Sequence, residues 1–265
     1  MTLFEIIVLA IIQGLTEFLP ISSSAHLLLP SIILGWQEQG LAFDVAVHVG
    51  SLTAVVIYFR NDLLALAKGW FGQFAGQGTS PESRMAWWLI LATMPAIVVG
   101  LLAKSFIEEY ARSGWVIAFT TIVFGLLLLW ADRTAKQNLS MDNLGWRGAL
   151  TIGLFQILAL IPGTSRSGIT MTAGLMLGLD RVSAARFSFM LSIPVIIGAG
   201  TLLTLDLLAS PDLVDWSSLI YGSILSFVSA YACIYFFLSF ISKIGMLPFV
   251  LYRLFLGILL VILMI

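Results

Sequence analysis

The chain of 265 residues contains six uninterrupted apolar stretches of about the length that crosses a lipid bilayer. A helix needs about 20 apolar residues to span the ~30 Å hydrocarbon layer, because each residue advances about 1.5 Å. The composition agrees, since 60% of the residues are hydrophobic and only 10% are charged. The sequence therefore predicts an all-α polytopic membrane protein and excludes a water-soluble globular domain. The six predicted full spans are residues 43–59, 85–104, 114–131, 183–205, 216–241 and 245–265.

The charged and sulfur-containing residues exclude other classes of protein. The 13 Lys and Arg residues against 14 Asp and Glu residues give a net charge of −1, so the chain lacks the basic surface that binds nucleic acid. Cys233 is the only cysteine and two histidines occur, so we expect no disulfide framework and no Cys/His cluster dedicated to a metal. The expected partners are membrane lipids, and residues 1–265 are expected to form a single integral membrane domain.

Two further apolar segments, residues 3–34 and 146–179, are each interrupted by a proline beside hydroxyl residues. The interruptions read QGLTEFLPISSSAH at 13–26 and QILALIPGTSRSG at 156–168. Each contains a glutamine, then five or six residues, a proline, one further residue and a pair of hydroxyl side chains. This likeness predicts an internal repeat, about 1–132 and 146–265, in which a pair of re-entrant half-helices precedes three full spans. Chance resemblance between two serine-rich turns is the alternative interpretation.

The three spans in each copy predict an inverted-topology repeat, because an odd number of crossings makes the second copy enter from the opposite face. When the basic residues within the second interruption and the last span are left out of the count, this topology puts nine basic residues on one side of the membrane and two on the other. Loops rich in Lys and Arg stay in the cytoplasm, so both termini are expected on the outer face. Residues 61–83 lack periodicity and are expected to form a cytoplasmic linker. The nine basic residues are Arg60, Lys68, Arg84, Arg133, Lys136, Arg147, Arg181, Arg186 and Lys243, and the two are Lys104 and Arg112.

The two interruptions are expected to meet and to form a binding site. Backbone that leaves a helix at membrane depth must be buried in protein or face a polar cavity. Half-helices of about 12 residues rise ~18 Å, so tips that enter from opposite faces can meet near the middle of the bilayer. Serine and threonine begin helices well, and two helix N-termini with unpaired N–H groups favour an anion such as phosphate. The residues expected to bind it are Gln13, Ser22, Ser24, Gly163, Thr164, Ser165, Ser167 and Gly168.

Glu17 and Arg166 are the charged residues of the two interruptions, and charges in a membrane are costly unless they face a cavity or a partner. The planar guanidinium of Arg166 suits phosphate oxygens, while an ion pair with Glu17 is a structural alternative that does not exclude this role. His26 lies one turn after the serines, within reach of Ser22 or Ser23, and a buried structural histidine is its alternative interpretation. Serine, histidine, carboxylate and arginine together are the parts of a covalent phosphoryl-transfer site.

At these residues the chain resembles the undecaprenyl-diphosphate phosphatase family of bacitracin-resistance integral membrane enzymes. The resemblance rests on the motifs at 13–26 and 162–168 and on the layout of the whole chain. It implies hydrolysis of undecaprenyl diphosphate to undecaprenyl phosphate and inorganic phosphate, which recycles the lipid carrier for cell-wall synthesis. The implied location is the bacterial inner membrane, with termini and active site facing the periplasm. The implied partners are a polyprenyl diphosphate lipid, a divalent cation (Mg²⁺ or Ca²⁺) and a second copy of the chain in a homodimer.

The resemblance also implies roles for the residues of the site. Ser23 corresponds to the proposed nucleophile, His26 to the family's histidine, Glu17 to an acidic residue and Arg166 to the phosphate-binding arginine. Gln13 stands where some members have an acid, which argues against a two-carboxylate metal site and leaves Glu17, with Gln13 beside it, as the expected cation ligand. A mechanism in which His26 is the nucleophile stays open beside the one that uses Ser23.

A secondary transporter or lipid flippase is the rival interpretation, because inverted repeats with broken helices also characterise transporters. The combination of serine, histidine, carboxylate and arginine favours an enzyme. Asp44 and His48 lie one turn apart at the start of the first full span, and we expect them to form a hydrogen-bonded structural pair and not a catalytic one.

Overall fold

The computed structural model describes residues 1–37, 39–103, 113–208 and 215–264. These residues form helices joined by short turns, with a single isolated bridge between Leu139 and Leu179 and no β-strand in the described part of the chain. The α-helices are α1 (Leu3–Phe18), α2 (Ser23–Leu34), α3 (Leu41–Tyr58), α4 (Arg60–Gly72), α5 (Pro81–Leu102), α7 (Gly114–Thr134), α8 (Trp146–Ile157), α9 (Arg166–Met176), α10 (Arg181–Leu208), α11 (Trp216–Ile244) and α12 (Leu247–Met264).

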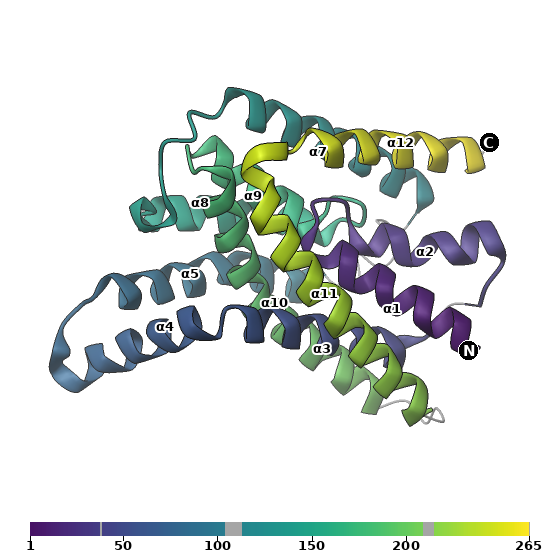
Figure 1. Cartoon of the computed structure of the whole chain (residues 1–265), viewed down its shortest axis with the longest axis horizontal. Helices are drawn as coiled ribbons and strands as arrows, with labels where there is room; N and C mark the ends of the chain where they lie inside the picture. Colours follow the sequence, from purple (N-terminus) through teal and green to yellow (C-terminus); the bar gives the residue numbers. More distant parts are fainter. Residues whose placement is uncertain (38, 104–112, 209–214, 265) are drawn as a thin grey trace.

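Six of these helices, α3, α5, α7, α10, α11 and α12, are long and apolar enough to cross a membrane. They coincide with the six predicted spans to within a few residues at each end, which confirms that part of the prediction. Lys104 and Arg112, the two basic residues expected on the outer face, lie outside the described residues. The two termini lie at the same, right-hand end of the molecule in Figure 1.

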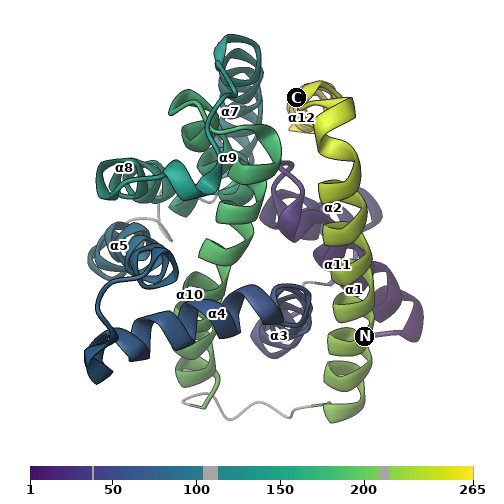
Figure 2. The ribbon, with the colours of Figure 1, turned by 60° about the vertical axis from the view of Figure 1, so that its left-hand side comes forward.

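The helices pack in pairs around the two interrupted segments. Helix α11 packs against α3 and α1, α12 packs against α7, and α5 packs against α8, while α9 contacts α7, α8 and α10 (Figures 1 and 2). A row of aromatic rings joins α1 to α10 and α11 at the core: the ring centroids of Phe18 and Phe189 are 5.2 Å apart, and those of Phe189 and Phe237 are 5.6 Å apart. This packing fixes the end of α1, where Glu17 lies.

The prediction of a linker at 61–83 is wrong for most of this segment. Residues 60–72 form α4 and Gln73–Gln77 form a short π-helix, which leaves only a short turn before α5. The segment is rich in leucine and alanine, which favour helices, and Leu63 and Leu66, three residues apart, pack on the main core. Further along α4, the rings of Trp70 and Trp87 lie 5.7 Å apart. The apolar residues on one face of α4 pack against α5, and this packing stabilises a helix despite the polar residues of the segment.

Candidate active site

The first interruption bends the chain between α1 and α2 and presents its serines to a cavity. Pro20 has no backbone N–H and follows the last residues of α1, so the helix ends there. Ser22 is the N-cap of α2 and has φ 74° and ψ 98°, an uncommon conformation for a residue with a side chain. Its hydroxyl lies 3.2 Å from that of Ser24 and makes no capping hydrogen bond, so the expected serine cap is absent from α2.

The second interruption has the same local geometry. Ser165 is the N-cap of α9 with φ 70° and ψ 111°, and its hydroxyl accepts a hydrogen bond from Gly168 N at 3.2 Å, which confirms the expected cap here. The hydroxyls of Ser165 and Ser167 lie 3.2 Å apart, as do those of Ser22 and Ser24 in the first interruption. Two non-glycine residues with nearly equal positive φ values, each one residue before a helix, are therefore found at matching points of the two motifs.

Gly163 and Gly168 are needed for close packing behind this second turn. Gly163 has φ 87°, and a Cβ there would lie 2.3 Å from Thr120 Oγ1. Thr120 Oγ1 in turn donates to Pro162 O at 2.6 Å, so α7 packs directly against the turn. A Cβ at Gly168 would lie 3.0 Å from Arg253 Nη1. Both glycines thus allow neighbouring groups to approach the backbone closely, and neither lines either of the cavities described below.

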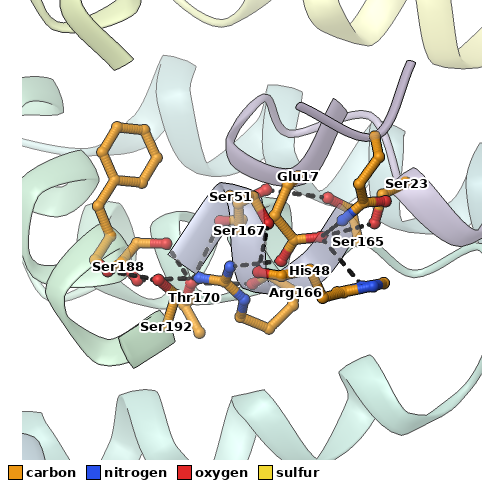
Figure 3. Close-up of polar contacts among 12 residues, drawn as sticks. Glu17, Ser23, His48, Ser51, Ser165, Arg166, Ser167, Thr170, Ser188 and Ser192 are labelled. Atoms are coloured by element: carbon orange, nitrogen blue, oxygen red, sulfur yellow. Dashed lines mark hydrogen bonds and ion pairs between the residues drawn. The ribbon is translucent and has the colours of Figure 1, made fainter. Parts of the chain in front are cut away.

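Glu17 joins the two interruptions (Figure 3). Its Oε1 accepts a hydrogen bond from Arg166 Nη2 at 2.9 Å, in an ion pair between two segments far apart in the sequence. Its Oε2 accepts one from Ser23 Oγ at 2.9 Å and one from Gln13 Nε2 at 3.0 Å. The carboxylate therefore holds a serine hydroxyl and a guanidinium on its two oxygens. The ion pair that was the alternative interpretation is thus present, and Ser167 Oγ, which donates to Leu19 O at 2.8 Å, adds a second contact between the interruptions.

Arg166 is held from both ends of its guanidinium. Nη2 bonds to Glu17, and Nη1 donates to the carbonyl of Ser188 on α10 at 3.0 Å. The Ser188 hydroxyl lies 2.7 Å from Thr170 Oγ1, and Thr170 Oγ1 donates to the Arg166 carbonyl at 2.8 Å (Figure 3). The side chains of Glu17 and Arg166 are 9% and 13% exposed, so the pair is largely shielded but still reaches a cavity. A side chain that stabilises a phosphoryl group during its transfer has to be held in a fixed position in this way.

A cavity of about 280 Å³ lies against this pair. Its polar side is formed by both interruptions and its apolar side by α10 and neighbouring helices. A second cavity of about 560 Å³ shares Ser23, Ser24, His48 and Leu203 with the first, so the two spaces meet at the serines. The polar residues that line the first cavity are Thr16, Glu17, Ser22, Ser23, Ser24, His48, Gln156, Ser165 and Arg166. The predicted residues Gln13, Gly163, Thr164, Ser167 and Gly168 line neither cavity and lie behind its wall.

His26 lies apart from the other predicted residues. Its Nδ1 is 2.6 Å from the backbone carbonyl of Ser22, and its Nε2 is 2.7 Å from the hydroxyl of Tyr252. The two rings are stacked with their centroids 5.4 Å apart. Helical geometry predicted a hydroxyl of Ser22 or Ser23 as its partner, but the rotation of α2 turns the ring toward α12. Among the described residues, both ring nitrogens of His26 are occupied, and neither contacts Glu17 or Arg166.

His48 occupies the place expected for His26. Its Nε2 lies 3.9 Å from Glu17 Oε2, and it lines both cavities (Figure 3). Its Nδ1 is 2.7 Å from the carbonyl of Asp44, where only a donor can bond, so Nε2 is the nitrogen directed at the site. The expected pairing of Asp44 with His48 thus exists, but through the backbone of Asp44. A histidine on an apolar helix face was the signal that could have placed it in the site.

Gln13 and Gln156 are related residues of the two interruptions, and both are buried. Gln13 donates to Glu17, and Gln156 Nε2 donates to Ala92 O at 3.3 Å. The Oε1 atoms of both side chains have no hydrogen-bond partner in the described part of the chain. Buried unpaired oxygens are costly, so they are suited to a ligand that supplies a donor or a cation. No group of three or more His, Cys, Asp or Glu residues that could hold a metal occurs among the described residues.

Arg253 holds both interruptions from behind, a role that the sequence did not reveal. This residue of α12 is fully buried, and its Nη1 donates to Pro20 O at 3.3 Å and to Thr164 O at 3.0 Å. Its Nη2 donates to Gly163 O at 3.0 Å. Two further bonds reach carbonyls of Thr120 and Thr121 on α7, at 3.3 and 3.0 Å. An arginine within an apolar span was the available signal, because such a residue must find partners inside the protein.

One family model and two relatives of this chain agree with one another. A family model described as "Bacitracin resistance protein BacA" matches residues 6–259. The chain is 61% identical over 258 residues to a protein of Pseudoalteromonas translucida named "Undecaprenyl-diphosphatase 1", with 97% of each chain covered. It is 64% identical over 257 residues to a protein of Alteromonas mediterranea named "Undecaprenyl-diphosphatase", again with 97% of each chain covered.

Proposed function

Since this chain belongs to the family of the bacitracin resistance protein BacA, we propose that it hydrolyses undecaprenyl diphosphate to undecaprenyl phosphate and inorganic phosphate. The relatives named for this activity match almost the whole chain, and six apolar helices suit an enzyme whose substrate is a membrane lipid. The observation that carries the proposal is the carboxylate of Glu17, which bonds to Ser23 and to Arg166 at the wall of one cavity.

In the proposed reaction, Ser23 is the nucleophile. Its Oγ attacks the terminal phosphorus of the diphosphate and transfers its proton to Glu17 Oε2, to which it already donates. The bond between that phosphorus and the bridging oxygen breaks, and the prenyl phosphate leaves with the electron pair. Glu17 passes the serine proton to the departing prenyl phosphate and is again a carboxylate. Water then attacks the phosphoserine and gives one proton to Glu17, the bond between the phosphorus and Ser23 Oγ breaks, and Glu17 returns that proton to Ser23 Oγ as inorganic phosphate leaves. Glu17 thus acts as general base in both steps.

Charge stabilisation in this scheme comes from Arg166 and from the helix N-termini. The guanidinium is fixed by Glu17 and Ser188, so it needs no rearrangement when charge develops on the phosphoryl oxygens. Helices α2 and α9 begin at Ser23 and Arg166, and each helix N-terminus favours an anion. These electrostatic interactions are stronger in the apolar surroundings of the cavity than they would be in water.

A divalent cation, Mg²⁺ or Ca²⁺, fits the residues present only in part. Glu17 and the unpaired Oε1 of Gln13 are oxygen donors of the kind that both ions prefer. They cannot form a complete coordination shell by themselves, so we propose that the cation would arrive with the diphosphate, with Glu17 as its protein ligand and Gln13 bonded to Glu17 from behind the cavity wall. Bound there, it would neutralise part of the charge of the substrate.

We further propose that the two interruptions are re-entrant half-helix pairs of an inverted repeat, residues 1–132 and 146–265. The equal backbone conformations of Ser22 and Ser165 and the matching hydroxyl pairs support this relation. The ion pair of Arg181 with Asp132, 2.6 Å between Nε and Oδ1, joins two segments predicted on the cytoplasmic side. The termini and the active site would then face the periplasm of a bacterial inner membrane.

Purified wild-type protein is expected to release inorganic phosphate from farnesyl and longer prenyl diphosphates in detergent, without any ion gradient. A chelator should reduce the rate if the proposed cation takes part.

In sealed vesicles, farnesyl diphosphate added outside should be hydrolysed by right-side-out membranes and spared by inside-out ones, which tests the periplasmic site. A protein that moves labelled solute into liposomes on a Na⁺ or H⁺ gradient, and releases no phosphate, would be the rival transporter or flippase.

The identity of the nucleophile can be tested by trapping the covalent intermediate. With substrate labelled in the terminal phosphate and rapid quenching in SDS at neutral pH, which preserves both phosphoserine and phosphohistidine, the label is expected on Ser23, because its hydroxyl already donates to Glu17. His26 bonds through both ring nitrogens to other groups, so the geometry favours serine. Ser24→Ala is the matched control and should still form the adduct. Label recovered on His26, or no adduct from an active enzyme, would contradict the assignment to Ser23.

A further inference from the structure

An apolar groove lies between α3 and α10, two candidate membrane spans. The two helices pack against each other (Figure 2). Its volume is about 330 Å³, within the range that binds small ligands. The walls are formed by aliphatic side chains, of which Val49, Ile197 and Leu205 are 47%, 51% and 58% exposed. Exposure of apolar residues is expected on a surface that faces lipid, so it does not by itself indicate a binding site.

The groove is distinguished by its continuity with the active-site cavity. His48, Ile196 and Gly200 line both spaces, so the groove leads from the membrane-facing surface to the wall that carries Glu17 and Arg166. Gly200 leaves the junction open, because a Cβ placed there would have no protein atom within 4 Å. The substrate of the proposed reaction has the same two parts in the same order, an anionic diphosphate and an apolar isoprenoid chain.

The hydroxyl groups of the two threonines in the groove are satisfied within their own helix. Thr201 Oγ1 donates to Ile197 O at 2.7 Å, and Thr204 Oγ1 donates to Gly200 O at 2.7 Å. Both threonines therefore use their hydroxyl protons on the backbone and can present their methyl groups to a ligand. A hydrocarbon chain in the groove would leave no donor unpaired, whereas a polar ligand would find few partners there.

We propose that this groove binds the isoprenoid chain of the substrate next to its diphosphate. The proposal rests on the proposed phosphatase function and adds the binding site for the lipid part. On α3 the groove extends from Val45 to Leu52, a rise of about 10 Å. It therefore covers the part of the chain nearest the diphosphate, and the remainder of a long chain lies in the bilayer.

Gly200→Leu is expected to block the junction without disturbing the fold, since the space is free and leucine favours a helix more than glycine does. The variant should lose at least tenfold in kcat/KM for undecaprenyl diphosphate. Val49→Phe narrows the groove from α3 at a residue that lines neither of the other two cavities. It should therefore give the same loss for undecaprenyl diphosphate and stay within twofold of wild type for isopentenyl diphosphate, whose chain is a single isoprene unit. Gly198→Leu is the matched control, because Gly198 lies two residues away on α10, next to Ile97 and outside the groove.

Two outcomes would overturn the groove assignment. One is unchanged hydrolysis of undecaprenyl diphosphate by folded Gly200→Leu and Val49→Phe proteins, as expected if bilayer lipid or a second copy of the chain covers the groove. The other is an equal loss for undecaprenyl and isopentenyl diphosphate in the folded Val49→Phe protein. Photolabelling with a diazirine-bearing prenyl diphosphate gives a readout that needs no turnover, and labels are expected within Val45–Leu52 and Ile196–Leu205. Labelling there without phosphate release from any diphosphate would support the groove and contradict the phosphatase function. Labels confined to other helices would contradict the groove alone.

Discussion

Arg166→Ala is expected to lower kcat/KM for phosphate release from a prenyl diphosphate by about a thousandfold or more. Loss of one preorganised donor to a developing anion costs about 3 to 4 kcal/mol, and arginines that stabilise phosphoryl transfer can contribute more. The substitution also removes the partner of Glu17 Oε1 and the bond to Ser188 O, so the carboxylate that positions Ser23 becomes less constrained. Steady-state phosphate release in detergent measures the effect.

Two further variants separate the role of Arg166 in the site from a general loss of charge. Arg166→Lys retains the cation without the planar fork and should recover only part of the activity. Arg186→Ala removes the arginine of a half-exposed ion pair with Asp62, 2.7 Å between Nη2 and Oδ1, which lines no described cavity. It should keep near-normal turnover. Near-normal turnover of a folded Arg166→Ala protein would contradict the anion site.

Arg253→Met is expected to reduce the free energy of unfolding by at least about 3 kcal/mol. The guanidinium donates to five carbonyls, on α7 and at both interruptions, and these oxygens are buried with it. A buried carbonyl left without a donor costs roughly 1 to 3 kcal/mol, although local relaxation recovers part of this. Unfolding followed by SDS titration in mixed micelles measures the difference.

A surface arginine gives the comparison for this loss. Arg147 is exposed at the start of α8 and lies over the ring of Trp146, so Arg147→Met should change the free energy of unfolding by less than about 0.5 kcal/mol. Arg253→Lys keeps a positive charge but cannot reach both interruptions with one ammonium group, so it should be intermediate. Wild-type stability of Arg253→Met would contradict the view that Arg253 holds the two turns in place.

The sequence predicted the parts of the fold that depend on chain length and local chemistry. Long apolar stretches can only be buried in a membrane, so the six spans were readily found. Proline near serine marked both helix ends, and the cost of charge in lipid predicted that Glu17 and Arg166 would face a cavity or find a partner. These inferences need no knowledge of how the helices pack.

Features that depend on tertiary packing were not predicted. Periodicity shows which residues of α2 share a face, but contact with Tyr252 decides that His26 points away from Glu17. For the same reason His48, on α3, took the position next to the carboxylate that His26 was expected to fill. The helical segment 60–72 was missed because its polar and glycine residues suggested a linker, while its leucines and alanines become informative only once they pack against α5.

The position of Arg253 has a consequence for the biosynthesis of the protein. Glu17 and Ser23 are translated early, yet their counter-charge Arg166 and the residue that holds both turns follow 149 and 236 positions after Glu17. At about 5 to 20 residues per second, roughly 10 to 50 s separate the synthesis of Glu17 from that of Arg253. Until Arg166 is made, the nascent chain carries the carboxylate of Glu17 without its counter-charge, and until Arg253 is made neither turn has the guanidinium that holds it. A chain that ends before α12 is therefore expected to lack the fixed arrangement of Glu17, Ser23 and Arg166.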